Sequence, residues 1–467
     1  MDEKKISEFF EEHREEFIKD IGALVAIPSV SVPGAPGPYP FGENCAKVLE
    51  EALSMGKKLG LEVQNHDYYC GSIVLPGEEG GEIGMFAHLD VVPEGDGWKN
   101  PPYELREEDG WLFGRGSTDN KGPAVTALYA MRCIKESGIK LRHSIRLFLG
   151  CSEENGMLDI AYYLKHFKAP DFSFTPDASF SVCYSEKGIF EADYTAPLPK
   201  ELKEFSAGTA SNAVAGSACA ILSDPSVCEP ELNQKDWPGI HFSRENGLLK
   251  IEAVGSSAHA AFPEGAVNAG AVLAAYLRES GLLGEEACRI LGYPAECFAG
   301  HYGEAIGIDY ESEQLGRLTA VCGMIRTEGD KLRLNINIRY PAEVDSRQMA
   351  EKIAGKAASY GWESGVVRDD APAYISPENP LVKALDEACK KQLGASFAPY
   401  TMGGGTYARK LPNAVAFGPG IRGQKKPGPD GHGGGHQPDE CVQLKVLEDA
   451  FHIYVNSLIV VDKLLTP

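Results

Sequence analysis

The sequence predicts a two-domain α/β protein in which an inserted α+β domain with an antiparallel sheet interrupts the first domain. At 467 residues the chain is longer than one hydrophobic core usually organises. Helix-like and strand-like patterns alternate up to about residue 186, whereas Gly-rich and Pro-rich segments interrupt the pattern from about residue 187. A helix pattern returns near residue 380. We therefore expect segments 1–186 and 376–467 to form one domain and segment 187–375 to form the other.

The first domain is predicted from hydrophobic periodicity and from residues that end helices. Apolar residues between Ile6 and Ile21 recur at helical spacing, and a second helical pattern ends just before Gly60, a suitable residue after a helix. Pro123 fits the first turn of a third helix, which ends near Gly138. The expected strands are residues 72–75, 83–89, 144–150 and 172–176, and the expected helices are residues 6–21, 43–58, 123–138 and 380–393.

The inserted domain is predicted from one strictly alternating run, KLRLNINIRY at residues 331–340. Its apolar side chains fall at every second position, between arginines and asparagines. Side chains of a strand point alternately to its two faces, so this pattern indicates a half-buried strand of an antiparallel sheet.

The charge of the chain limits its partners. A net charge of −22 argues against binding to nucleic acids or to anionic membranes. No apolar run approaches the length that spans a bilayer, and the amino terminus has a helical pattern unlike a signal peptide. We therefore expect a cytoplasmic protein that acts on a small molecule.

The triplet His88-Leu89-Asp90 at the end of a strand-like run suggests metal chemistry. Two residues apart on a strand, His88 and Asp90 would point to the same face. His88 could then bind a metal while Asp90 accepts the other ring N–H and fixes the tautomer. A hydrogen-bonded structural histidine is the competing interpretation of this triplet.

Further carboxylates and imidazoles follow at loop positions, each with an alternative explanation. Asp119 is either a carboxylate that bridges two cations or a helix cap, and Glu153-Glu154 is either a base beside a ligand or an exposed loop end. Asp177 offers another oxygen ligand. His432 and His436 compete for the last position, and the residues alone leave that choice open. His259 is either a structural histidine or a donor to an oxyanion that requires domain closure.

Together these residues resemble the zinc aminoacylase/carboxypeptidase G superfamily, and within it the dipeptidase V type related to carnosinases. The resemblance spans nearly the whole chain in the family's order. Its carriers are His88-Leu-Asp90-Val-Val-Pro93, Gly95–Trp98, Gly114-Arg115-Gly116, Asp119-Asn120-Lys121-Gly122-Pro123, Ser152-Glu153-Glu154, Thr175–Ala178, Ser185–Gly188, Ser257–Ala260, Gly403–Arg409 and His436-Gln437-Pro438-Asp439-Glu440. One departure is Asn120, where these dipeptidases often have a second aspartate.

The resemblance implies a fold of the zinc-peptidase type, with the inserted domain as a lid. It implies two zinc ions per chain, for which manganese or cobalt can substitute. The implied metal ligands are His88, Asp119, Glu154, Asp177 and His436, with Asp119 bridging and His436 chosen over His432. It further implies that Asp90 orients His88, that Glu153 is general base and then acid, and that the Asp119-Asn120 peptide is cis. Asn212, His259, Arg339, Gly403, Gly404 and Gly405 would contact the substrate.

The resulting hypothesis is a two-zinc dipeptidase for small peptides, including β-alanyl dipeptides, in which metal-bound hydroxide attacks and Glu153 serves as base. An N-acyl-amino-acid deacylase or desuccinylase with the same metal site is the alternative enzyme. A metal-dependent binding protein without activity is a third interpretation, disfavoured because Glu153 accompanies all five ligands. The predicted lid of about 190 residues resembles that of monomeric dipeptidases, so we expect a monomer.

Overall fold

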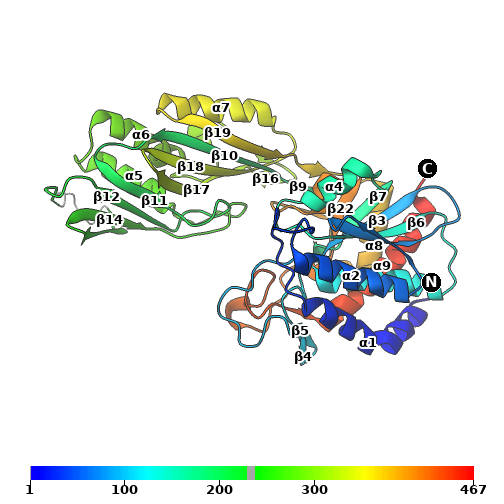
Figure 1. The fold of residues 1–467 in the computed structure, drawn as a ribbon. Coiled ribbons are helices and arrows are strands. Elements are labelled where there is room, and N and C mark those ends of the chain that lie inside the picture. Colours follow the sequence, from blue (N-terminus) through cyan, green and yellow to red (C-terminus); the bar gives the residue numbers. More distant parts are fainter. Residues whose placement is uncertain (1, 229–236, 467) are drawn as a thin grey trace. The chain divides into compact units, whose positions relative to one another are not determined.

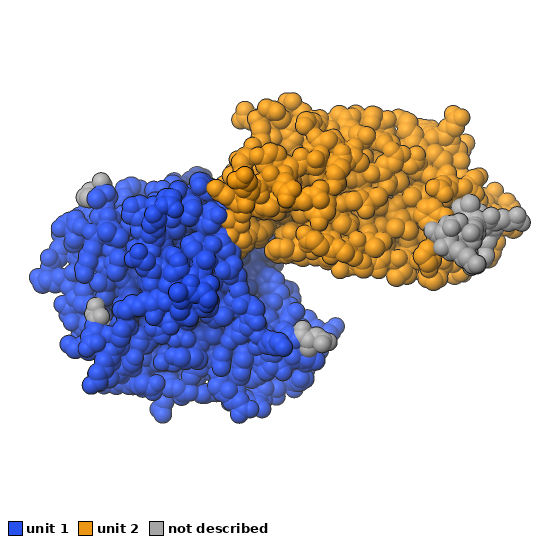
Figure 2. Space-filling model, turned by 180° about the vertical axis from the view of Figure 1, so that it is seen from behind, with its two compact units in different colours: residues 1–185, 374–400, 405–467 blue, residues 186–373, 401–404 orange. Residues whose placement is uncertain are grey.

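The computed structural model describes residues 2–228 and 237–466, which form two compact units (Figure 2). Unit 1 contains residues 1–185, 374–400 and 405–467, and unit 2 contains residues 186–373 and 401–404. The predicted fold class, an α/β domain interrupted by a domain with an antiparallel sheet, is confirmed. Within the described ranges, none of the helices combines the length and apolar character that crossing a bilayer requires.

Unit 1 is built on a mixed sheet (Figure 1). Strands β6, β3, β7 and β22 are neighbours in that order and run parallel, and β1 and β2 continue the sheet antiparallel beyond β6. Parallel strands end at the same sheet edge, so the loops after β3, β6 and β7 meet there. The strands are β1 (Glu62–His66), β2 (Cys70–Leu75), β3 (Glu82–His88), β6 (Ser144–Gly150), β7 (Phe172–Thr175), β9 (Val182–Glu186), β20 (Ala373–Tyr374), β21 (Tyr400–Met402) and β22 (Ala414–Phe417).

Helices cover both faces of this sheet because its side chains alternate. Met85 and Ala87 of β3 enter the main core beneath α1 (Glu3–Val25), α2 (Glu43–Lys58), α3 (Lys121–Glu136), α8 (Pro380–Leu393) and α9 (Leu444–Leu464). Phe86 joins a smaller core with α4 (Leu158–His166) and the short helix η2 (Tyr407–Lys410) on the other face. Small additional strands are β4 (Arg106–Glu108), β5 (Trp111–Phe113), β8 (Ala178–Phe180), β23 (Pro419–Ile421) and β24 (Cys441–Gln443), and η3 spans Pro429–Gly431.

Unit 2 contains an antiparallel sheet with the strand order β13-β14-β12-β11-β17-β18-β10-β19. Its core lies between this sheet and helices α5 (Ala269–Glu279), α6 (Glu285–Cys297) and α7 (Ser346–Ser359). The strands are β10 (Gly188–Pro197), β11 (Leu202–Ala207), β12 (Ser217–Leu222), β13 (Ile240–Glu245), β14 (Leu248–Val254), β17 (Thr319–Glu328), β18 (Lys331–Tyr340) and β19 (Glu363–Asp370), with β15 (Glu311–Ser312), β16 (Gly316–Arg317) and η1 (Glu304–Ile306) outside the sheet.

The alternating run predicted at residues 331–340 is strand β18, and its apolar face is buried as expected. Its polar face differs from the prediction at one end, because Asn337 and Arg339 are also buried. Strand β18 lies in the interior of the sheet, between β17 and β10, and Arg339 donates to Asn337 Oδ1 at 2.9 Å. A buried arginine retained at the end of a strand is compatible with binding a ligand.

Candidate metal centre

The predicted ligands of unit 1 lie where neighbouring parallel strands end. His88 is the last residue of β3, Glu153 and Glu154 follow β6, and Asp177 follows β7. Asp119 comes just before α3, and His436 lies in the loop before β24. Strands β6, β3 and β7 are neighbours in the sheet. The loops that follow them therefore bring together residues far apart in the sequence, such as His88 and Asp177, which are separated by 89 positions.

Asp119 contacts two imidazole rings through different carboxylate oxygens. Its Oδ1 lies 3.0 Å from His88 Nε2, and its Oδ2 lies 3.2 Å from His436 Nε2. The helix-cap explanation for Asp119 is wrong, because Asn120 precedes α3 as its N-cap residue and neither side chain caps the helix. The predicted cis peptide at Asp119-Asn120 is confirmed.

Each of the two rings also faces a second carboxylate. His88 Nε2 lies 3.8 Å from Asp177 Oδ2, and His436 Nε2 lies 2.8 Å from Glu154 Oε1. Ligand atoms of His88, Asp119 and Glu154 all lie within 4.8 Å of one another. The loop thus brings His436 to these carboxylates, as the resemblance implies.

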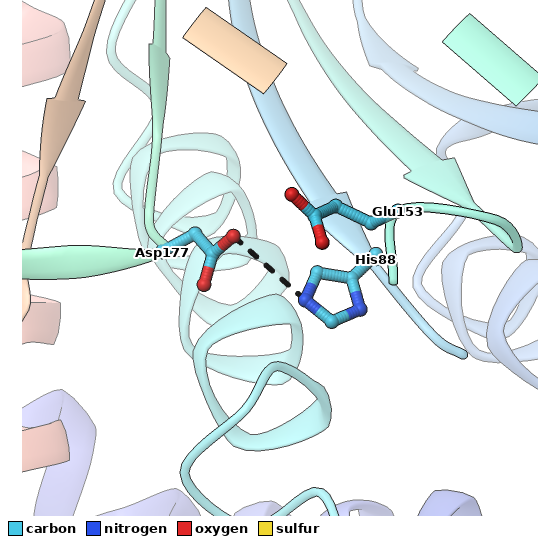
Figure 3. Close-up of side chains that lie close together, drawn as sticks. All are labelled: His88, Glu153 and Asp177. Atoms are coloured by element: carbon cyan, nitrogen blue, oxygen red, sulfur yellow. Dashed lines mark ion pairs between the residues drawn. The ribbon is translucent and has the colours of Figure 1, made fainter. Parts of the chain in front are cut away.

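Glu153 belongs to the same cluster. Ligand atoms of His88, Glu153 and Asp177 lie within 4.8 Å of one another, and Figure 3 shows both carboxyl groups directed toward the His88 ring. Burial raises the pKa of Glu153 well above its usual value, and the charge of Asp177 adds to this effect. These distances would allow Glu153 to act either as a metal ligand or as a general base.

Neighbouring carboxylates favour the protonated forms of His88 and His436. Burial lowers the pKa of His88, but hydrogen bonds to Asp119 and Asp90 raise it well above its usual value. Hydrogen bonds to Asp119 and Glu154 raise the pKa of His436 to about 11. A proton on Nε2 of either ring would lie between that nitrogen and carboxylate oxygens, in the kind of position that a cation would occupy.

Asp90 fixes both His88 and the glutamate loop. His88 Nδ1 donates to the main-chain carbonyl of Asp90 at 2.9 Å, and the Asp90 carboxylate oxygen lies farther away, at 3.4 Å. That carboxylate instead accepts the backbone N–H groups of Glu153 and Glu154, at 3.2 and 3.1 Å. Asp90 lies beyond the end of β3, so its carboxylate reaches this loop as well as the ring.

The sequence analysis missed Glu440, which holds the loop that carries Asp119. Its Oε1 accepts the N–H groups of Thr118 and Asp119, both at 3.0 Å, and its Oε2 pairs with Arg115 at 2.7 Å. Glu440 and Arg115 are both buried. Both residues lie in motifs that carry the resemblance, which is the signal that could have identified them.

It also missed Asp159, which holds the start of the glutamate loop from the first turn of α4. Asp159 Oδ2 accepts the N–H groups of Cys151 and Ser152, both at 2.7 Å, and the hydroxyl of Tyr407 at 2.5 Å. Gly150 is required beside this network, because a Cβ atom there would lie 1.9 Å from the Tyr407 hydroxyl oxygen. Burial raises the pKa of Asp159 to about 6.

The predicted substrate contacts lie in unit 2, except Gly405, which belongs to unit 1. Arg339 Nη1 donates to the Gly403 carbonyl at 3.4 Å. The main-chain carbonyl of Asn212 accepts from the N–H of Ala260, the residue after His259, at 2.8 Å. Burial and the charge of Arg339 both lower the pKa of His259. Unit 2 thus gathers Asn212, His259, Arg339 and Gly403 in one region of its own structure.

The donor set of unit 1 fits divalent cations. Imidazole nitrogens and carboxylate oxygens are the ligands of zinc, and manganese and cobalt accept the same set. Two imidazoles and several carboxylates in mutual contact provide enough donors for two ions, with one carboxylate shared.

The peptidase family M20/M25/M40 matches residues 84–459. The chain belongs to this family. It is 33% identical to "Putative dipeptidase YtjP" of Bacillus subtilis (strain 168), over 95% of this chain and 97% of that protein. It is 31% identical to the Beta-Ala-Xaa dipeptidase of Lactobacillus delbrueckii subsp. lactis, over 88% and 90%. The structure of the di-peptidase Dug1p of Saccharomyces cerevisiae covers 99% of both chains, with a TM-score of 0.59 and 13% identity, so this M20/M25/M40 chain shares its fold.

Proposed function

We propose that this chain is a dipeptidase that uses two divalent cations, with zinc as the resident ion and β-Ala-Xaa dipeptides among its substrates. The observation that carries the proposal is Asp119, whose two oxygens contact His88 and His436 separately. Two relatives at 31% and 33% identity are named as dipeptidases, one of them for β-Ala-Xaa peptides. We further propose that the chain acts as a monomer, with segment 187–375 as a lid.

The residues divide into two ligand sets that share Asp119. His88 and Asp177 would hold one cation, and His436 and Glu154 would hold the other. Bound at these positions, divalent cations would supply Lewis-acid activation of a water molecule and of the scissile carbonyl. Asp90 would keep the His88 tautomer with its Nε2 free for the cation, because Nδ1–H donates to the Asp90 carbonyl.

Glu153 would accept the proton of the attacking water and return it to the leaving amine. A general base must be held within hydrogen-bond reach of its proton, and the N–H of Glu153 is fixed by Asp90 at 3.2 Å. Burial and neighbouring carboxylates favour the protonated form of Glu153, which suits a group that must later donate. The four other carboxylates contact imidazoles or backbone N–H groups, so Glu153 is the residue we assign to proton transfer.

Substrate recognition would come from unit 2. Arg339 presents a planar guanidinium suited to the terminal carboxylate of a peptide, and the Gly403–Gly405 backbone would assist. His259 and Asn212 would donate to the developing oxyanion. Support for these roles is the grouping of Arg339, His259 and Gly403 within unit 2.

A metal count combined with a substrate panel tests the proposal. We expect about two zinc ions per chain and hydrolysis of α- and β-alanyl dipeptides, with slow turnover of N-acetyl and N-succinyl amino acids. Preferred turnover of the N-acyl substrates would instead identify a deacylase. Two bound ions without hydrolysis of any amide would identify a binding protein.

Glu153→Gln tests the assignment of the base. We expect kcat to fall by roughly three orders of magnitude or more while both ions remain bound. Glu104→Gln, at an exposed glutamate, is the matched control and should behave as wild type. Loss of an ion from Glu153→Gln would show that this residue is a ligand and not the base.

A further inference from the structure

A cavity opens beside the metal centre within unit 1. It has a volume of about 300 Å³, and Asp119 and Asp177 line one part of it. The same cavity is lined by Lys426 and by apolar side chains such as Val442 and Val446. This volume is at the lower limit of small-molecule pockets, a size suited to one portion of a small peptide. The proposed mechanism gives no role to the walls beyond the two aspartates.

Lys426 is the unusual residue of this cavity. It is half-buried, its Nζ donates to the Cys441 carbonyl at 2.7 Å, and it lies 5.7 Å from the centre of the Trp111 ring. Among the ion pairs found within residues 2–228 and 237–466, none involves Lys426. Burial lowers the pKa of Lys426, the charges of Cys441 and Glu440 act against this effect, and the Glu440 carboxylate is already paired with Arg115.

A partly buried ammonium without a carboxylate partner is best satisfied by an anionic ligand. Taking a charge out of water is unfavourable, and a charge-assisted hydrogen bond from a carboxylate recovers much of this cost. Cations at Asp119 and Asp177, which line the same cavity, would offset the two negative charges that would otherwise repel an anion. The apolar walls suit the methylene groups that join such a carboxylate to a peptide backbone.

We propose that this cavity binds the side chain of an aspartate or glutamate in the dipeptide substrate, with Lys426 as its cationic contact. The inference depends on the proposed dipeptidase activity and deepens it by naming a substrate class. Hydroxyl groups of Thr118 and Ser179 line the same cavity and supply polar surface near the carboxylate. Lys426 would thereby select acidic dipeptides over neutral ones of the same length.

The test compares kcat/KM for Glu-Ala, Ala-Glu, Gln-Ala and Ala-Gln in zinc-loaded protein. We expect wild type to prefer one acidic peptide over its amide isostere by about 10-fold or more, the effect of one charge-assisted hydrogen bond. Lys426→Met should abolish this ratio, Lys426→Arg should keep most of it, and Lys426→Glu should reverse it. The neighbouring exposed lysine provides the matched control, because Lys425→Met should leave the ratio as in wild type.

The possible outcomes separate this inference from the proposed function. Hydrolysis of all four peptides with equal kcat/KM, unaltered in Lys426→Met, overturns the acidic pocket but leaves the dipeptidase intact. Alternatively, Lys426→Met keeps the wild-type melting temperature and loses kcat/KM equally for acidic and amide peptides. That result would assign Lys426 to the terminal carboxylate of the peptide and would also overturn the inference. Absence of hydrolysis of any dipeptide by wild type defeats the proposed function itself. The pocket is supported if Lys426→Met loses the preference for the acidic peptide over its amide isostere while Lys425→Met keeps it.

Discussion

Loading the metal-free protein with zinc should release about two protons at pH 7.5, because His88 and His436 must give up the protons they hold between carboxylates. An ordinary imidazole with a pKa of about 6.5 is only about 10% protonated at this pH, so two of them would release about 0.2 protons. Here hydrogen bonds to Asp119 and Glu154 raise the pKa of His436 to about 11, and that of His88 is also well above its usual value. His436 is therefore protonated at this pH, and the raised pKa of His88 favours its protonated form as well.

Isothermal titration calorimetry in buffers of different ionisation enthalpy measures this number. The slope of the apparent binding enthalpy against the buffer enthalpy gives the protons released per chain. Glu153 can contribute a third proton because burial raises its pKa, so the titration is repeated with Glu153→Gln. His436→Gln should release about one proton fewer than wild type. His432→Gln, a change in the same loop, should release as many protons as wild type.

A release near 0.2 protons would refute the reasoning, because it would mean that both rings are neutral before metal binding. The same protonation fixes the sign of two pH effects. The affinity for each zinc ion should rise by about one order of magnitude per pH unit while its histidine is protonated, so the product of the two binding constants should rise by about two orders. In the metal-free protein the pKa of His436 is raised on folding, so its contribution to stability is complete below pH 6.5 and is lost as pH rises toward about 11. The ring is 54% exposed, so water screens part of this contribution.

Three substitutions test the residues that support the centre. Asn120→Ala removes an amide that donates to the Pro176 main-chain carbonyl at 2.6 Å, so zinc affinity in a chelator competition should fall by about 10-fold or more, and wild-type affinity would contradict this role. Glu440→Gln leaves its buried arginine partner without a counter-charge, so the free energy of unfolding in urea should fall by about 3–5 kcal/mol; a loss below about 1 kcal/mol would disprove a structural ion pair. Gly150→Ala places a Cβ atom 1.9 Å from the Tyr407 hydroxyl oxygen and should lower the melting temperature by several degrees, whereas Gly80→Ala, with no atom within 4 Å, should not.

Periodicity predicted several of the elements that have one buried face, and it missed others, among them one buried on nearly all sides. The residue bounds of α2, β6, β18 and α8 agree with the predicted ranges. Helix α9 was not predicted, although it is 21 residues long. The run from Ala450 to Val455 is buried without interruption, because α9 packs against α3 and α8 as well as α1. A helix that is apolar all round lacks the 3.6-residue alternation on which the prediction depends.

Residue chemistry identified the candidate metal-binding side chains, because few residue types can ligate a cation and these residues follow strand ends. It could not find Asp159 or Glu440. A buried acid that accepts backbone N–H groups looks the same in a sequence as a solvated acid on a loop, and only the tertiary contacts distinguish them. The residues alone also could not decide whether His432 or His436 joins the predicted metal site, since both lie in the same glycine-rich loop. The contact of His436 with Glu154 in the folded chain favours His436.

Buried carboxylates that bind no cation fix the loops that do. Asp159 accepts the N–H groups of residues 151 and 152, Asp90 those of residues 153 and 154, and Glu440 those of residues 118 and 119. Four consecutive N–H groups after β6 therefore have carboxylate acceptors, so this loop has its conformation without a metal. A site whose supporting contacts are already formed needs little rearrangement to bind its ions. The cations are therefore needed less for folding the loops than for offsetting the charge of the carboxylates gathered there. Without cations, protons on His88 and His436 would offset part of that charge.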